Sequence, residues 1–326
     1  MRRLLAVLSF VVIGLIGGQA AAQDLGTLKL GVQQFGTVSW ELDVIRHHGL
    51  DRKHGFALEV QPFAQAEAAD IGLMGDAVDG IVEDWLWVAR QRGEGMEMTF
   101  IPYSSSIGAL MVRPDRGIAS LADLKGKKLG IAGGPLDKSW LIVQGLAKQE
   151  YGIDLKAEAT PVYGAPPLLT EKIKTGELDA VLNYWHFCGR LEAQGYPQLI
   201  GVNEAQAALG VPASAPQLGY VFKQRFADEH PDLVRAFAEA SREAKQIMAT
   251  SDEEWQRLKP LTRADDDATL KALQRRFVEG IVPHWGAAEQ QQAADLYLIL
   301  ARLGGEELVG KAPELVDGTF WSGLSY

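Results

Sequence analysis

Short apolar runs alternate with helical patterns along the first two thirds of the chain. Runs such as 28–32, 80–82, 129–132 and 180–182 are short enough to be buried parallel strands. Between these runs, apolar residues recur at helical spacing, which favours helices that cover the strands. The alternation predicts an α/β fold with mostly parallel sheets. Beyond it, residues 226–249 are predicted to form one long amphipathic helix, and residues 252–304 are helical by pattern.

The segment from Ile118 to Trp140 combines a helix, a strand, a turn and a second helix. Ser120 is placed to cap a short helix, which precedes the strand at 129–132. Two glycines and a proline at 133–135 break this strand, and helical spacing begins again after Asp137. In a parallel sheet, the crevice beyond the end of such a strand faces the free N–H groups of the next helix. The segment therefore predicts a site for a polar or anionic ligand.

Polar and aromatic residues follow several other predicted strands. Glu83 to Trp87 come directly after 80–82, and Asn183 to His186 come directly after 180–182. Because parallel strands end at the same edge of a sheet, these residues are expected to line one cleft.

Five tryptophans occupy such positions at strand ends, although a single tryptophan is more often a core residue. They are Trp40, Trp85, Trp87, Trp140 and Trp185. We expect at least two of them to face the cleft. Alternation of side chains predicts that Trp85 and Trp87 point the same way, while only one of the two reaches a solute.

The polar residues leave the charge of the solute open. Asp84 and Asp137, together with tryptophans, would suit a cation, an amine or a hydroxylated molecule. The hydroxyl groups of Ser104, Ser105 and Ser139 and the N–H groups of 134–138 would suit an anion instead. Lys138 is compatible with a solute of either charge, since it can pair with a carboxylate of the protein or with the ligand itself. The full predicted ligand-binding set is Gln34, Phe35, Trp40, Asp84, Trp85, Ser105, Gly134, Asp137, Lys138, Ser139, Trp140 and Trp185.

The N-terminus and the charge balance indicate where the protein works. Arg2 and Arg3, an apolar run at 4–16 and three alanines at 20–22 are typical of a cleavable signal peptide over residues 1–22. Its removal changes the net charge from −10 to −12, which argues against nucleic acid or an anionic membrane surface as partner. The lone cysteine, Cys188, cannot form an internal disulfide. We expect a soluble exported protein in the periplasm.

Catalytic, metal and cofactor sites are weakly supported by the sequence. His186 and Cys188 would share a face if their segment were extended, but the sequence has no P-loop, dinucleotide fingerprint, HExxH or G-x-S-x-G motif. Glu83, Asp84 and Asp137 supply only three carboxylates, whereas a hard cation prefers six or more oxygen ligands. The prediction is a protein that is not an enzyme and that has no cofactor or metal.

Three segments resemble periplasmic solute-binding proteins of ABC importers, especially those for aliphatic sulfonates, taurine and nitrate. They are IASLADLKGKKLG at 118–130, GLDRKHGFALEVQPF at 49–63 and GELDA at 176–180, within a resemblance that covers most of residues 28–250. The resemblance implies a two-lobe periplasmic binding protein fold of type II, with a mostly parallel sheet flanked by helices in each lobe and a cleft between the lobes. It places residues 23–112 and 213–326 in the first lobe and residues 113–212 in the second.

The same resemblance implies a function. It predicts a monomer that captures a small polar organic solute or oxyanion and delivers it to an ABC permease in the inner membrane. An exported enzyme or a periplasmic sensor on the same scaffold is the alternative. The carboxylates of Glu83 and Asp84 stand where the usual sulfonate binders have small or neutral residues. This difference weakens the inference that the ligand of this protein is an anion.

Overall fold

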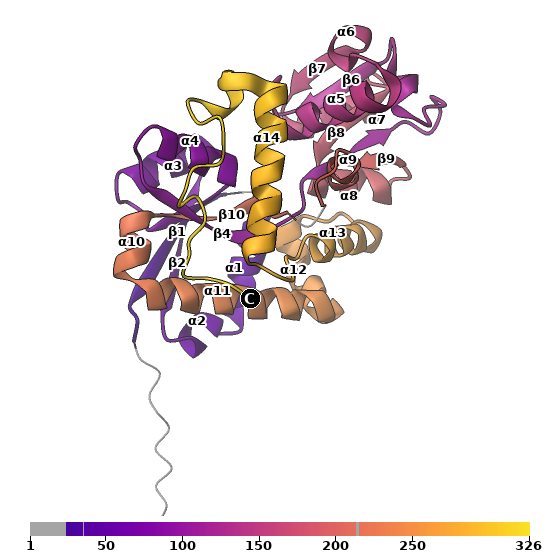
Figure 1. Ribbon diagram of the computed structural model, residues 1–326. Coiled ribbons are helices and arrows are strands. Elements are labelled where there is room, and N and C mark those ends of the chain that lie inside the picture. Colours follow the sequence, from indigo (N-terminus) through magenta and orange to yellow (C-terminus); the bar gives the residue numbers. More distant parts are fainter. Residues whose placement is uncertain (1–23, 35, 213–214) are drawn as a thin grey trace, which may run out of the picture.

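The computed structural model describes residues 24–34, 36–212 and 215–326. The predicted signal peptide at 1–22 lies outside the described residues. Within the described part, no helix combines the length and the apolar character needed to cross a membrane. The chain forms two bodies of sheet and helix, with the last helix between them (Figure 1).

The first lobe contains a five-stranded sheet in the order β2-β1-β3-β10-β4. Only β10 runs against its neighbours, since β1 pairs in parallel with β2 and β3 and β10 pairs antiparallel with β3 and β4. The strands are β1 (Thr27–Gln33), β2 (Ala57–Phe63), β3 (Gly80–Glu83), β4 (Met98–Ser104) and β10 (Leu218–Lys223). The helices of this part are α1 (Val38–His47), α2 (Leu50–Lys53), α3 (Ala66–Met74), α4 (Trp85–Gly93), α10 (Gln224–Glu229) and α11 (Pro231–Thr250).

The second lobe repeats this arrangement with the order β7-β6-β8-β5-β9. Here β5 is the reversed strand, since it pairs antiparallel with both β8 and β9. The strands are β5 (Gly108–Val112), β6 (Lys128–Ala132), β7 (Thr160–Gly164), β8 (Ala180–Tyr184) and β9 (Gln198–Gly201). The helices are the short 3-10 helix η1 (Leu121–Leu124), α5 (Lys138–Tyr151), α6 (Leu155–Glu158), α7 (Pro166–Lys174), α8 (Trp185–Ala193) and α9 (Val202–Ala208). The expected two-lobe α/β architecture with mostly parallel sheets is confirmed.

The boundary between the lobes lies earlier than expected. Residues 108–112 were assigned to the first lobe, but β5 hydrogen-bonds to β8 and β9 in the second sheet. The chain therefore crosses between the lobes at residues 105–107 and returns before β10. The apolar pattern predicted the strand but not its sheet, because strand pairing depends on residues far away in the sequence.

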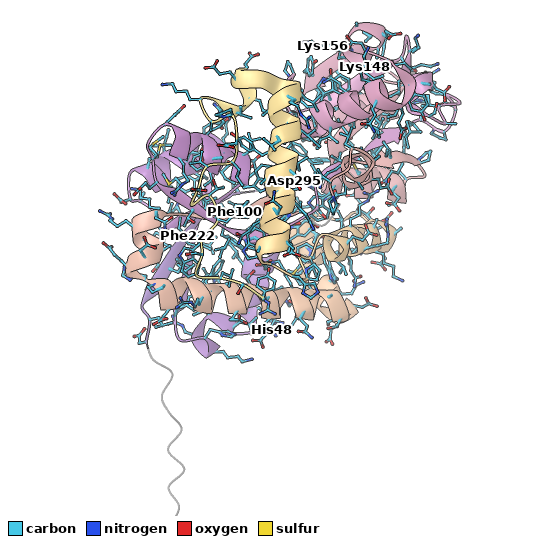
Figure 2. All side chains as sticks on the ribbon, in the orientation of Figure 1. His48, Phe100, Lys148, Lys156, Phe222 and Asp295 are labelled. Atoms are coloured by element: carbon cyan, nitrogen blue, oxygen red, sulfur yellow. The ribbon has the colours of Figure 1, made fainter. Side chains whose placement is uncertain are left out.

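Both faces of the central strands β5, β6 and β8 of the second sheet are mostly buried, which explains their nearly continuous apolar sequences. In β5, Leu110 and Val112 belong to the main core, whereas Ala109 and Met111 pack in a smaller cluster with Val181. The main core extends through both lobes. In the first lobe, Phe100 and Phe222 lie close together on the neighbouring strands β4 and β10 (Figure 2).

The predicted helix over 226–249 is divided in two. The structure ends α10 at Glu229 and begins α11 at Pro231, where proline is tolerated in the first turn but not in the middle of a helix. The residues between 252 and 304 are helical as expected, in α12 (Asp252–Thr262), α13 (Asp267–Glu279) and α14 (Ala287–Val309).

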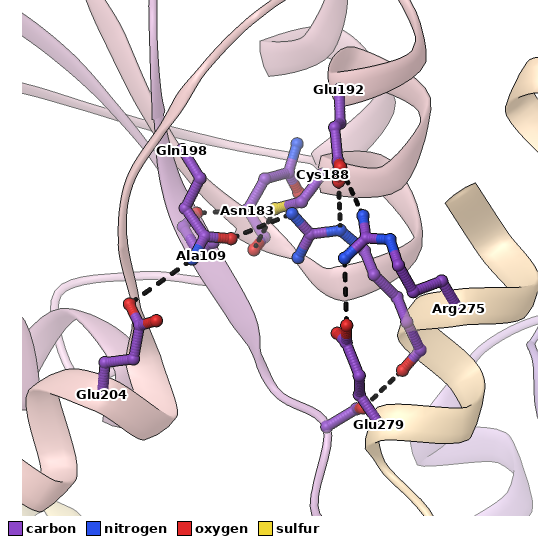
Figure 3. A network of polar contacts seen from close by, with 10 residues as sticks. Ala109, Asn183, Cys188, Glu192, Gln198, Glu204, Arg275 and Glu279 are labelled. Carbon is purple, nitrogen blue, oxygen red and sulfur yellow. Dashed lines mark hydrogen bonds and ion pairs between the residues drawn. The ribbon is translucent and has the colours of Figure 1, made fainter.

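The C-terminal helices contact both lobes. Helix α13 packs on α8, and α14 contacts α4 of the first lobe and α5 of the second (Figure 1). An ion-pair network reinforces the first contact, because Glu192 of α8 binds both Arg275 and Arg276 of α13 (Figure 3).

Helix α14 is kinked at its C-terminal end. Gly305 has a φ of 61°, a conformation that side chains rarely adopt, and Leu308 and Val309 beyond it are buried. A side-chain carbon on Gly304 would lie 2.6 Å from Leu308. The kink and the small residue before it therefore allow Leu308 to turn back toward the lobes.

Candidate functional site

A cavity of about 400 Å³ lies between the two lobes. Its wall is built at the carboxyl ends of β1, β3 and β8 and at the N-terminus of α5, with Leu308 of α14 on one side. This is the place where parallel α/β sheets ordinarily hold ligands. A larger hollow of about 810 Å³ is lined only by residues 298–313 and does not lie between the lobes.

The glycine-rich turn after β6 places Asp137 at the cavity. Gly133 has a φ of 89°, and a side-chain carbon there would lie 2.7 Å from Oδ2 of Asp137. Asp137 caps α5, since its Oδ1 accepts hydrogen bonds from the backbone N–H of Ser139 at 2.9 Å and of Trp140 at 3.4 Å. The turn predicted from the sequence is thus present, but its own carboxylate occupies the free N–H groups of the helix.

An ion pair joins the lobes across the cavity. Lys138, at the start of α5, places its Nζ 3.0 Å from Oδ2 of Asp84, at the start of α4. The same Nζ donates a hydrogen bond to the backbone carbonyl of Gln217 at 3.2 Å. The other oxygen of Asp84 accepts from the N–H of Trp87 at 2.7 Å and so caps α4. One carboxylate therefore fixes a helix and bridges the two lobes.

The carboxyl groups around this pair hold their protons more tightly than usual. Burial, together with the negative charges of Asp84 and Asp70, raises the pKa of Glu83 to about 8. Burial and the charge of Glu67 raise the pKa of Asp70 to about 6, and burial raises the pKa of Asp137. Glu83 is thus mostly protonated at neutral pH.

Tyr184 and His186 also line the cavity. Burial and the nearby carboxylates raise the pKa of Tyr184 to about 12. Burial and the charge of Arg190 lower the pKa of His186 to about 3, so the imidazole is neutral. Its Nδ1 is buried and has no hydrogen-bond partner among the described residues.

Of the five tryptophans at strand ends, only Trp185 lines the cavity in the described part of the chain, although at least two were expected. Trp40, Trp85 and Trp140 are buried in the core with 4%, 0% and 0% exposure. Trp85 and Trp87 do not point alike, because Asp84 starts a helix at this position and no extended strand forms.

Trp185 nevertheless connects the cavity to the core. Its ring lies 5.8 Å from that of Trp40 in an edge-on contact, and Trp40 lies 6.0 Å from Trp255 of α12. These aromatic contacts join α8 of the second lobe to α1 of the first.

The remaining predicted ligand-binding residues divide between the cavity and other places. Asp84, Asp137, Lys138, Ser139 and Trp185 are together on its wall. Ser105 lies instead beside a neighbouring hollow of about 430 Å³, where its hydroxyl donates to the carbonyl of Gly280. Gln34 is exposed and Gly134 half-buried, both away from the wall, and Phe35 lies outside the described residues.

Several lining residues are missing from the predicted set. Glu83, Tyr184 and His186 lie on the wall, as their position at or just after the ends of β3 and β8 predicts, although they were not included among the ligand-binding residues. Leu308 gives no such signal, because it reaches the cavity from a helix far away in the sequence.

Cys188 and His186 do not form a reactive pair. Both lie in helix α8, where residues two apart point to different sides, and Cys188 is fully buried in the smaller core. Its Sγ donates to the carbonyls of Asn183 and Ala109, as Figure 3 shows. Burial raises the pKa of the Cys188 thiol to about 11. A neutral, enclosed thiol is a poor nucleophile.

Native protein is therefore expected to resist alkylation at Cys188. Iodoacetamide at about pH 8 should label the folded protein slowly and the urea-unfolded protein completely, because only unfolding exposes the thiol and frees it to ionise. Mass spectrometry measures the labelled fraction. Equal labelling rates for folded and unfolded protein would contradict the burial of Cys188.

Solved structures share this two-lobe fold at low sequence identity. The aliphatic sulphonate-binding protein SsuA from Escherichia coli superimposes with a TM-score of 0.70 and 16% identity, covering 90% of each chain. SsuA from Xanthomonas axonopodis pv. citri, bound to MOPS, gives 0.67 and 17%, covering 90% of this chain and 98% of that one. The desulfurization enzyme DSZB, with biphenyl-2-sulfinic acid, gives 0.62 and 12%, covering 91% and 96%.

Comparison of the sequence itself identifies a family. No curated protein matches the chain. Residues 48–254 match the family described as NMT1/THI5 like, which is well over half of the chain. With its two-lobe fold and its cavity at the strand ends, the chain belongs to the NMT1/THI5-like family.

Proposed function

We propose that this protein is the exported solute-binding component of an ABC importer. It captures a small polar organic solute in the cavity between the lobes and delivers it to a permease in the inner membrane. It works in the periplasm as a monomer, after removal of the predicted signal peptide at 1–22. The similar proteins named for sulfonate binding support this class of function.

The single observation that carries the proposal is a cavity whose wall both lobes supply. Asp84 and Glu83 come from the first lobe, and Lys138 and Trp185 come from the second. A solute that contacts both sets favours the closed arrangement, because it binds that arrangement more tightly than an open one. The closed form is then the form that docks on the permease.

The wall suits binding better than covalent catalysis. Cys188 is enclosed in the second lobe, and in the described part of the chain the cavity wall contains no cysteine. DSZB shows that the same fold can hold an enzyme. The fate of the bound solute therefore separates the two functions: a binding protein releases it unchanged, whereas an enzyme converts it.

A tryptophan at position 66 is expected to abolish solute binding. Ala66 is on the cavity wall at the start of α3, so an indole there fills the space without changing any charge. The purified protein is dialysed against a small-molecule extract of the periplasm, and retained compounds are released by denaturation and identified by mass spectrometry. The wild-type protein should retain a compound that is chemically unchanged, and Ala66→Trp should retain at least about tenfold less.

The exposed position Ala64, two residues earlier, provides the matched control. Ala64→Trp should retain as much as wild type, and thermal unfolding should show that both variants fold. Equal retention by Ala66→Trp and wild type would exclude this cavity as the binding site. Retention of a converted product by wild type would favour the enzyme.

A further inference from the structure

The cavity wall carries more carboxyl groups than basic side chains. Glu83, Asp84 and Asp137 all line it, and Lys138 is the only lysine or arginine on the wall within the described residues. A fourth carboxyl group, Asp70, interacts electrostatically with Glu83 from α3, and its Oδ1 has no hydrogen-bond partner in the described structure. Glu83 is mostly protonated at neutral pH, and the charge of Lys138 is already paired with Asp84. The wall therefore has no spare positive charge to attract an anionic solute, and its carboxyl groups favour a cationic one.

The ammonium group of Lys138 marks a position suited to a cation. It lies between a carboxylate oxygen of Asp84 and the backbone carbonyl of Gln217, at 3.0 and 3.2 Å. Both neighbours are hydrogen-bond acceptors, so an ammonium group satisfies them and a sulfonate oxygen cannot. Lys138 reaches this position from the opposite lobe and so acts as a tethered cation in the cavity.

The helix N-terminus closest to Lys138 offers little to an anion. The N–H groups of Ser139 and Trp140 already donate to Asp137. His186, on the same lobe as Lys138, lines the cavity as a neutral imidazole and adds no positive charge that would attract an anion. The helices α1 and α8 start at the cavity without a side-chain cap, and a sulfonate would bind there if the solute were an anion.

We propose that the solute is an organic amine whose ammonium group replaces that of Lys138 at Asp84 and the Gln217 carbonyl. The inference rests on the proposed solute-binding function and names its substrate class. Lys138 is then a specificity residue that competes with the amine and keeps the empty cavity neutralised. A sulfonate binder would need Lys138 for the opposite reason, as its anion ligand.

The variant Lys138→Met separates these two roles by the sign of its effect. Wild type and variant are dialysed against an equimolar mixture of putrescine, agmatine, choline, ethanesulfonate, butanesulfonate, nitrate and glycerol, and retained compounds are quantified by mass spectrometry. Putrescine or agmatine should be retained, and their affinity should rise about tenfold in Lys138→Met, because the competing ammonium is gone. Lys148→Met is the control, since this exposed lysine, labelled in Figure 2, is on the same helix but does not line the cavity.

The variant Asp84→Asn tests the other partner. The amide keeps an oxygen that can cap α4 but removes the charge, so amine affinity should fall about tenfold or more while thermal unfolding changes little. Retention of a sulfonate that is lost in Lys138→Met would overturn the inference. The inference would also be overturned if neither wild type nor Lys138→Met retained an amine, or if Asp84→Asn bound the amine as tightly as wild type.

The two proposals fail in different ways. If wild type retains an anionic or neutral compound from the periplasmic extract and Ala66→Trp does not, solute binding stands and the amine assignment is wrong. If wild type retains nothing from the extract, the solute-binding function itself is wrong.

Discussion

Replacing Lys245 with methionine should lower the free energy of unfolding by about 3–5 kcal/mol, as measured by urea denaturation. Nζ of Lys245 lies 2.7 Å from Oε2 of Glu41, and the two side chains are 7% and 0% exposed. Burial lowers the pKa of Lys245, and the charge of Glu41 opposes this change. Methionine leaves the carboxylate of Glu41 in the core without its cation. An uncompensated buried charge destabilises the folded state more than removal of both charges would.

The surrounding hydrogen bonds explain why the pair is tolerated. Tyr220 and Ser241 donate to Oε1 of Glu41 at 2.8 and 2.6 Å. The double variant Glu41→Gln, Lys245→Met should therefore recover much of the lost stability, since no unpaired charge remains. Lys148→Met, at an exposed position, should change stability by less than about 0.5 kcal/mol. A loss below about 1 kcal/mol for Lys245→Met alone would contradict the role of the ion pair.

Trp85→Ala should also destabilise the protein by about 3–5 kcal/mol. The indole is fully buried, its Nε1 donates to the carbonyl of Pro216 at 2.6 Å, and its ring lies 6.2 Å from that of Tyr297 of α14. Alanine leaves a cavity and an unpaired carbonyl. Urea denaturation measures the effect.

The neighbouring Trp87 provides a comparison for this variant. Trp87 is on the same helix but is only half-buried, so Trp87→Ala should cost clearly less than Trp85→Ala. If Trp85→Ala weakened solute binding without a loss of stability, Trp85 would belong to the cavity wall and its assignment to the core would be wrong.

The sequence predicts local structure well, such as helix caps, turns and short strands. The segment from Ser120 to Trp140 folds as expected because its signals are local: Ser120 and Asp123 form a capping box, glycines allow the turn, and Asp137 caps the next helix. The strands that frame the cavity were likewise predicted, because each is a short apolar run between clear breaks.

The sequence predicts long-range arrangement less well. It places tryptophans at strand ends, but the side to which an indole turns depends on partners such as Tyr297 and Pro216, which come more than 100 residues later. The same limit applies to β5, whose apolar pattern fits either sheet. The sequence also does not predict which carboxylate pairs with Lys138. The structure shows that this partner is Asp84, on the opposite lobe.

The kink of α14 has a consequence for the order in which this protein can be assembled. Leu308 joins the cavity wall from close to the C-terminal end of the chain, after Gly305 has redirected the helix. During synthesis, both sheets are complete by Lys223, but the wall around the solute is finished only when Gly305 to Val309 have followed. A shortened chain that stops before Gly305 would contain every strand, but it would lose Leu308 from the chamber and the backbone hydrogen bonds of Thr319 and Trp321 to Phe100 of β4.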